Sequence, residues 1–283
     1  MATTDEALLE RYLEGETISR DEAVEAMHKG VAKGEVIPLF CGSGKLSYGT
    51  HALLKKMVEL LPHPGEMPGE VGRRHGLDQE VTLEAEDSGP PAALIFKTAT
   101  EPHVGELSFF KVLSGTVENG MELKNASRNA SEKLNHLSIP LGKERLEVPR
   151  LHAGDIGVVA KLKNSHTNDT LSDPSRPLVV EGVRFPKPDI SVAIRGVSRA
   201  DDDKLGEVLS KIHEEEPTFH HEFNAELGQT ICRGLGELHL NVQFERMKRK
   251  FGVSIETEAP KIAYRETLTR SAEGQGRHKK QSG

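Results

Sequence analysis

The sequence of 283 residues has no tryptophan, three tyrosines and only two cysteines. Cys41 and Cys232 lie far apart and form no CxxC pair, which argues against a disulfide framework or a zinc site. No apolar run approaches the roughly 20 residues that a membrane-spanning helix needs, and the start MATTDEALLERYLEG lacks the basic and apolar regions of a secretory signal. We therefore expect a soluble, cytoplasmic protein that does not contact a membrane.

Charge is distributed unevenly along a chain that is mildly acidic overall. The 37 basic and 44 acidic residues give a net charge of −7, which by itself argues against a dedicated nucleic-acid-binding protein. Residues 201–216 hold seven acids and two bases, whereas residues 245–283 hold ten bases and five acids. A locally basic surface can contact phosphates even on an acidic protein, so the C-terminal region is a candidate for nucleic-acid binding.

The N-terminal stretch combines helical patterns with one short apolar run. A helix with apolar residues at i, i+3 and i+7 follows a predicted cap at Ser19, and another helix ends at Pro62. Between them, the run VIPLFC at residues 36–41 predicts a buried parallel strand. Helices around a single strand indicate an α/β layer, so we interpret residues 1–68 as the end of an α/β domain that begins upstream.

A stretch without any apolar period separates this part from the next. Residues 62–91 are rich in proline, glycine and acidic side chains, as in PHPGEMPGEVGRRHG and EAEDSGPP. Such composition predicts a linker, whose extent we set at residues 69–90.

Short strand patterns replace helices in residues 91–185. Five apolar segments alternate with turn sequences such as ENG and AGD, at residues 93–97, 107–112, 121–123, 156–160 and 178–180. Closely spaced strands over so short a stretch predict a small closed β-barrel, with a β-sandwich as the alternative.

Strands and helices alternate again in the region that we assign to residues 186–258. The pattern predicts strands at 190–194, 218–225, 229–233 and 253–255, and helices around 205–212 and 240–251. The resulting order βαββαβ is that of a ferredoxin-like split βαβ unit. A last strand pattern at residues 262–267 begins a further unit, which we place at residues 259–283.

A glycine-rich loop at residues 42–45, Gly-Ser-Gly-Lys, follows the predicted strand. A phosphate-binding P-loop has the pattern G-x-x-x-x-G-K-[ST], but Leu39 stands at the first glycine position and Leu46 at the hydroxyl position. The loop therefore does not qualify as a P-loop. Backbone N–H groups at the end of a strand can still contact a ligand.

The sequence patterns give little support for metal binding or for nucleophilic catalysis. His213, His220 and His221 flank three glutamates, but no HExxH or paired Cys/His spacing is present, so we interpret them as a solvated helix end and an exposed strand. Cys41 and Cys232 lie in apolar surroundings that favour small buried side chains over reactive thiolates. We predict no catalytic residue and no metal ligand in this segment.

Basic residues cluster on the second helix of the βαββαβ unit. Lys248, Arg249 and Lys250 follow Arg246, and a second basic run, RHKK, occupies residues 277–280. Such runs form either the solvated face of a helix or a contact with phosphates. Because aromatic residues are scarce nearby, any RNA contact is expected to involve the backbone of structured RNA rather than stacked bases.

Several blocks of the sequence resemble the elongation factor G family of translational GTPases. EEEPTFHHEFNAELGQTICRGLGELHLNVQFERMKRKFGV at residues 214–253 is similar to the family's E-P-T-F, G-Q-T-I and G-E-L-H-L motifs. PKIAYRETLT and EGQGRHKKQSG are similar to its A-Y-R-E-T and Q-S-G motifs. Residues 90–120 and 151–171 resemble the second domain of translational GTPases, and EALLERYLEG and VIPLFCGSGK resemble the closing part of the GTPase domain.

The resemblance implies a multidomain fold of mixed α/β, β and α+β class. It would comprise the end of a P-loop GTPase domain, a translation-factor-type β-barrel, a ferredoxin-like domain and the first strand of a further domain. The family's phosphate loop, switch regions and Asn-Lys-x-Asp motif would precede residue 1, so this segment alone is expected to hydrolyse no GTP and to bind no cofactor. Only the last guanine-contacting loop maps here, at Ser43 and Gly44, and Gly44 departs from the family's usual Gly-Ser-Ala.

The resemblance also implies what the whole protein does. It would be a ribosome-dependent GTPase that binds GTP or GDP with Mg²⁺ and couples hydrolysis to movement on the ribosome, in translocation, recycling or both. Its partners would be ribosomal RNA and ribosomal proteins, with contacts at Lys248, Arg249 and Lys250, and it is expected to be a cytoplasmic monomer. Asn241 stands where the family usually has an acid, which indicates a diverged paralogue.

Two other functions fit the same residues. The first is a non-enzymatic ribosome- or RNA-binding protein built from the second and third domains. The second is a ribosomal-protection or release-factor-type GTPase, because such factors share the barrel and the split βαβ domain.

Overall fold

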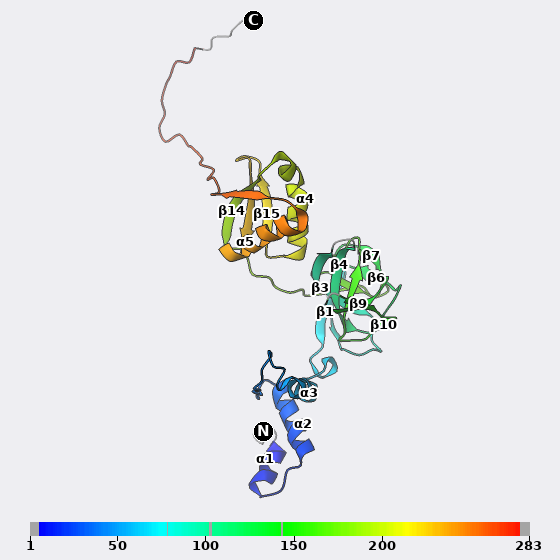
Figure 1. Ribbon diagram of the computed structural model, residues 1–283. Coiled ribbons are helices and arrows are strands. Elements are labelled where there is room, and N and C mark those ends of the chain that lie inside the picture. The colour runs from blue at the N-terminus through cyan, green and yellow to red at the C-terminus, as the bar shows by residue number, and fades with distance from the viewer. Residues whose placement is uncertain (1–5, 78, 102–103, 143, 278–283) are drawn as a thin grey trace. The chain divides into compact units, whose positions relative to one another are not determined.

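A computed structural model describes residues 6–77, 79–101, 104–142 and 144–277 (Figure 1). The chain divides into two compact units, Met1–Arg184 and Phe185–Gly283. Among the described helices, none combines the length and the apolar character that crossing a bilayer requires.

The N-terminal part consists of helices α1 (Glu6–Leu13), α2 (Arg20–Ala32) and α3 (Thr50–Leu60). The predicted cap at Ser19 is confirmed: its hydroxyl accepts a hydrogen bond from the Glu22 N–H, and the Glu22 carboxylate accepts one from the Ser19 N–H. Arg11 ties α1 to α2 through Nη1, which lies 2.6 Å from Glu22 Oε1. These hydrogen bonds, the one from Arg11 above all, lower the pKa of Glu22 to about 2.

The predicted strand at residues 36–41 is wrong. These residues form no regular structure, and Ile37 and Leu39 are 89% and 92% exposed. A parallel strand needs neighbours for its backbone hydrogen bonds, and within the described residues the only strand-type contact nearby is an isolated bridge between Ser43 and Tyr48. The regular structure of the described residues 6–61 is therefore helical, without the sheet of an α/β layer.

The segment predicted as a linker carries regular structure. After the short 3₁₀ turn η2 (Pro64–Glu66), β1 (Glu70–Arg74) and β2 (Glu80–Leu83) form an antiparallel hairpin. β1 also pairs with β13 (Leu178–Val180), which gives a three-stranded sheet in the order β13-β1-β2. The prediction of an unstructured segment is wrong because these strands are short and one partner lies about a hundred residues further along the chain.

The middle of the chain is all β, as predicted. The five predicted strands are present, together with six further ones among the described residues, and eight of the strands form one antiparallel sheet in the order β7-β6-β12-β3-β4-β11-β8-β9. Their bounds are β3 (Ala92–Glu101), β4 (Gly105–Ser114), β6 (Glu122–Asn125), β7 (Ala130–Lys133), β8 (Ser138–Leu141), β9 (Glu144–Glu147), β11 (Ile156–Ala160) and β12 (Thr170–Ser172). The short strands β5 (Val117–Glu118) and β10 (Arg150–Leu151) pair separately.

One apolar core lies inside this sheet. Fully buried side chains from β3, β4, β6, β11 and β12 share it, among them Ile95, Phe110, Leu123 and Leu171. Strands far apart in the sheet order thus face the same core, so the sheet curves around it. No pairing between the end strands β7 and β9 is recorded within the described residues, so the strand order shows a curved sheet and does not by itself show a closed barrel.

The second unit has the predicted βαββαβ order. It contains β14 (Ile190–Gly196), α4 (Arg199–Glu215), β15 (His220–Asn224), β16 (Gln229–Gly234), α5 (Glu237–Arg246), the π-helical turn η3 (Met247–Phe251) and β17 (Ile255–Glu258). The sheet is antiparallel throughout in the order β15-β16-β14-β17, which confirms the ferredoxin-like arrangement. Helices α4 and α5 lie against the sheet (Figure 1), and Leu209 and Ile212 of α4 and Leu240 of α5 share one core with it.

The predicted strand at residues 262–267 is also wrong. The described chain after β17 forms no regular structure, and its apolar side chains Ile262 and Tyr264 are exposed. An alternating pattern becomes a strand only when another strand supplies hydrogen-bonding partners, and none of the described residues does so here. The predicted basic run at residues 277–280 lies, apart from Arg277, outside the described residues.

Candidate nucleic-acid interface

The predicted basic cluster lies on η3, the wider turn that extends α5. Met247, fully buried in the core of the second unit, anchors the turn, and Gly252 in the left-handed conformation ends it. Lys248 and Arg249 are exposed and form no ion pair with any described residue. These two side chains are free to meet an external anion.

Lys250 differs from its two neighbours because it has an internal partner. Its ammonium group pairs with the Glu215 carboxylate at the end of α4, and Arg246 pairs with the same carboxylate. The Glu215 side chain is only 3% exposed. A carboxylate buried to this extent needs compensating cations, so Arg246 and Lys250 stabilise the contact between α4 and the end of α5.

The structure also brings together a basic surface that the sequence analysis missed. The all-β middle of the chain has an open groove of about 1250 Å³, which we call the basic groove. It is lined by Lys133, Arg145, Lys161 and Lys163. Their positions in sequence are scattered, and no basic run marks them. The curved sheet alone places them at one surface.

Acidic residues of the basic groove are largely engaged within the protein. The buried carboxylate of Glu132 accepts hydrogen bonds from the backbone N–H groups of Lys163 and Asn164 and from the Ser165 hydroxyl. Glu147 lies 3.1 Å from the ring of His136. Arg145 lies 3.9 Å from Glu101, so Lys133, Lys161 and Lys163 contribute most of the positive potential of the groove.

The Gly-Ser-Gly-Lys loop is an exposed turn in front of α3. The Ser43 N–H donates to the Tyr48 carbonyl oxygen at 3.0 Å, and the Ser43 hydroxyl accepts from the Leu46 N–H at 3.3 Å. Gly49, with φ of 79°, directs the chain into the helix. The Ser43 N–H is thus engaged within the loop, whereas the surroundings of Gly44 are open.

The loop does not fit the phosphates or the metal of a nucleotide. Exposed leucines, Leu39 and Leu46, stand where a P-loop has its first glycine and its magnesium-binding hydroxyl. No group of three or more histidine, cysteine or acidic side chains suited to a metal occurs in the described part of the chain. GTP or GDP with Mg²⁺ would need residues other than these.

Three histidines of the second unit lie close together, with the ring of His213 next to those of His220 and His221. The His213 Nδ1–H donates to the Phe219 carbonyl oxygen at 2.6 Å, and its ring centroid lies 5.1 Å from that of His220. Burial, and then the neighbouring His213, lower the pKa of His220 and His221. The neutral forms are therefore favoured.

The two cysteines have opposite surroundings. Cys232 is buried, and burial raises the pKa of its thiol to about 12, which makes it an inert core side chain as predicted. Cys41 is exposed, so the prediction that it is buried is wrong. The reason is the missing strand, since only a sheet would have covered this residue.

Comparison with known proteins identifies both β-containing regions. Residues 90–174 match the family described as elongation factor G domain 2, and residues 185–259 match elongation factor G, domain III. The chain is also similar to a protein from Thermus thermophilus of known crystal structure, with 33% sequence identity and a TM-score of 0.77. That similarity covers 92% of this chain and 37% of the Thermus protein.

The two family matches together span more than half of the chain and follow each other in the order of their domain numbers. They coincide with the curved β sheet and with the ferredoxin-like unit. The chain therefore belongs to the elongation factor G family, of which it carries domains II and III.

Proposed function

We propose that this chain is the central coupling segment of a translational GTPase of the elongation factor G type. Hydrolysis of GTP with Mg²⁺ would take place on a GTPase domain outside the described residues. Domains II and III would transmit the change to the ribosome, in translocation, in recycling or in both. The observation that carries the proposal is the adjacent pair of family domains, which supports a role in translation by a cytoplasmic, monomeric factor.

The contact with the ribosome would involve phosphates of structured RNA. Lys248 and Arg249 on η3 and the four cations of the basic groove are suited to such a contact. Lysine and arginine that neutralise RNA phosphates release condensed counterions, so the affinity would fall steeply with salt. Lys250 contributes less than its neighbours because Glu215 already holds its charge.

A role in guanine recognition would fall to Gly44 rather than to Ser43. The Ser43 N–H is used within the loop, whereas Gly44 is open to a ligand. We expect no binding of GTP by this chain alone in a fluorescence titration, because the loop lacks the groups that hold phosphate and Mg²⁺. Micromolar binding with turnover would contradict this expectation.

Ribosome binding at several salt concentrations tests the RNA contact. In the double variant Lys248→Glu/Arg249→Glu, the slope of log affinity against log salt is expected to decrease in magnitude by roughly 1.4 to 1.8, the loss of about two phosphate contacts. Arg199→Glu/Lys204→Glu on α4 is the matched control, with the same change of charge at two exposed residues that form no ion pair with any described residue. Equal effects of the two variants would show that only net charge matters, and unchanged binding would refute the contact.

A stand-alone binding protein and a GTPase differ in the coding region upstream of residue 1. An in-frame P-loop and Asn-Lys-x-Asp motif would support the GTPase, and a start codon without such motifs would support the non-enzymatic alternative. Ribosome-stimulated GTP hydrolysis by the whole protein, with assays of translocation and of ribosome splitting, would then separate the elongation factor G role from a protection or release factor.

A further inference from the structure

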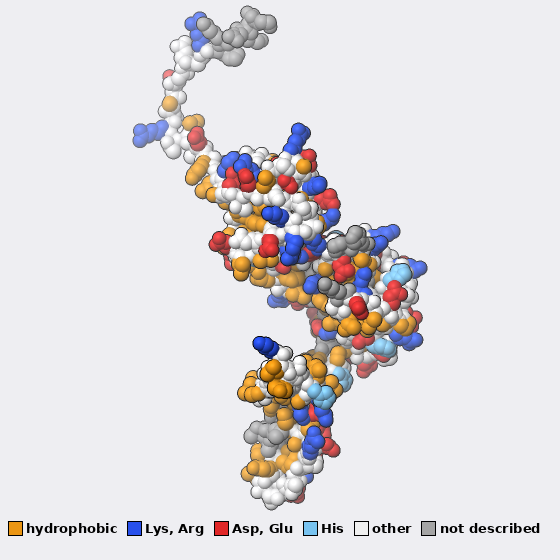
Figure 2. Space-filling model, in the orientation of Figure 1, with side chains coloured by type: hydrophobic (Ala, Val, Ile, Leu, Met, Phe, Trp, Pro, Cys, Tyr) orange, Lys and Arg blue, Asp and Glu red, His pale blue; other side chains and the backbone are white. Residues whose placement is uncertain are grey.

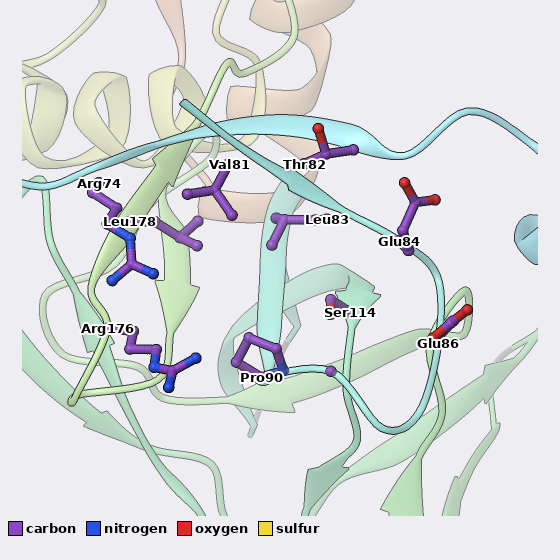
Figure 3. Close-up of a pocket in the computed structure, with 11 residues that line it drawn as sticks. Arg74, Val81, Thr82, Leu83, Glu84, Glu86, Pro90, Ser114, Arg176 and Leu178 are labelled. Carbon is purple, nitrogen blue, oxygen red and sulfur yellow. The ribbon is translucent and has the colours of Figure 1, made fainter. Parts of the chain in front are cut away.

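A second pocket lies in the first unit of the chain, and none of the residues that line it lines the basic groove. It has a volume of about 260 Å³ and lies between the three-stranded sheet β13-β1-β2, the turn that follows β2 and the end of β4 (Figure 3). Arg74 and Arg176 line one side of it, and Glu84 and Glu86 lie on the opposite side (Figure 3). The proposed contacts with RNA and with guanine leave this pocket unused.

The side chains of Arg74 and Arg176 have no ion-pair or hydrogen-bond partner among the described residues. The Nε–H of Arg74 is buried and donates no hydrogen bond within the protein, and Arg176 forms no ion pair. Of the described acids near them in sequence, Glu80 pairs with Arg73, and Asp173 accepts hydrogen bonds from Ser175. The Arg74 Nε–H is itself too deeply buried for a ligand to reach, so a ligand would meet the guanidinium ends of Arg74 and Arg176, which Figure 3 shows on the same side of the pocket.

The floor of the pocket between the arginines and the glutamates is apolar. Val81, Leu83 and Leu178 form it, and Leu83 and Leu178 belong to a small apolar core. The turn closes over the pocket because residue 89 is a glycine: a Cβ there would collide with the Ser114 hydroxyl. A ligand of this pocket therefore needs an apolar body beside its charged group.

The charges on the rim restrict the ligand further. Glu84 and Glu86 are exposed carboxylates on the side opposite the arginines. They would repel a second negative charge, so a polyphosphate or a nucleic acid is disfavoured relative to a single anionic group. An arginine fork binds one carboxylate through two parallel hydrogen bonds.

We propose that this pocket binds a small organic monoanion, a carboxylate on a short apolar body, with the carboxylate on Arg74 and Arg176 and the apolar body on Val81, Leu83 and Leu178. The site is distinct from the proposed RNA contacts. It assigns a ligand to a part of domain II that the proposed ribosome contacts leave unused.

Nuclear magnetic resonance of the ¹⁵N-labelled full chain tests the proposal, because the arginine Nε–H groups give their own signals. Hexanoate is the probe. Hexylammonium keeps the apolar body but reverses the charge, and inorganic phosphate keeps a negative charge but lacks the apolar body. We expect hexanoate to bind with a Kd of about 1 mM and to shift the Arg74 Nε–H signal, with both other probes at least about tenfold weaker.

Variants then locate the contact. Arg74→Gln and Arg176→Gln should each weaken hexanoate binding about tenfold, whereas Arg73→Gln, on the same strand but paired with Glu80, should leave it unchanged. Arg176 is exposed, so its variant keeps the test valid if Arg74→Gln fails to fold. The proposal is overturned if hexanoate does not bind up to about 10 mM or if hexylammonium binds as tightly as hexanoate. It is also overturned if Arg73→Gln has the same effect as Arg176→Gln.

Discussion

Helices α3 and α4 share the same apolar period but differ in what covers it. In α4, Leu209 and Ile212 are 1% and 0% exposed, because the helix packs on the domain III sheet. In α3, Leu54 and Val58 are 62% and 86% exposed, and hydrophobic side chains gather on the surface of the N-terminal helices (Figure 2). The period favours a helix, but its apolar face becomes a core only where another element packs on it, as the sheet does on α4 and as happens in α3 only at Leu60, which is buried.

The largest expected difference between the two helices concerns cavity formation. Ile212→Ala should lower the free energy of unfolding of domain III by about 2 to 5 kcal/mol, because it removes fully buried methyl groups. Leu54→Ala should change stability by no more than about 0.5 kcal/mol. Urea unfolding followed by circular dichroism measures both, and similar losses would mean that α3 packs as tightly as α4.

A second difference concerns buried and exposed ion pairs on α4 itself. Glu215→Gln should cost about 3 kcal/mol, since Arg246 and Lys250 lose their buried counter-charge. Glu207→Gln removes the exposed partner of Lys211 and should cost less than about 1 kcal/mol. If the two variants unfold at the same urea concentration, Glu215 does not hold the helix ends together.

A serine capping box begins both α2 and α4, but its loss is expected to affect only the start of α2 in one case and the whole of domain III in the other. Ser198→Ala removes the capping box with Asp201 at the start of α4 and should destabilise domain III by about 1 kcal/mol. Ser19→Ala removes the equivalent box of α2. Amide hydrogen exchange should show the first change across the whole domain III core and the second only within the first turns of α2; a global effect of Ser19→Ala would contradict this comparison.

The smallest expected effect is a dependence of domain III stability on pH. His220 and His221 have pKa values below the ordinary 6.5, so the unfolded chain binds protons that the folded chain does not. The stability is therefore full above pH 6.5 and falls as the pH drops below it. His220→Gln/His221→Gln should flatten this slope in urea titrations, and His51→Gln on the exposed α3 should not.

Local patterns predicted domain III almost completely. Its helices have long apolar periods and its strands follow each other closely, so each element and its partners lie within about 70 residues. The same reasoning failed at residues 36–41 and 262–267, where an apolar run or an alternating pattern found no pairing strand. It also failed at β1 and β2, whose three-stranded sheet depends on β13, a strand far along the chain.

The basic cluster shows the same limit of local patterns. A run of lysine and arginine shows where positive charge is concentrated, and Lys248 and Arg249 are indeed exposed. It does not show that Glu215, 35 residues earlier, takes up the charge of Lys250. Nor does it show the basic groove, whose four cations come from separate strands and loops.

The sequence by itself determined the helix periods, the cap at Ser19 and the motifs that place the chain in the elongation factor G family. These depend on residues a few positions apart, which local backbone geometry brings together. The tertiary structure decided which apolar faces are buried, which cations are free and that Arg74 and Arg176 line the same pocket. Burial and charge pairing depend on distance in space, and the pairing of distant strands sets that distance.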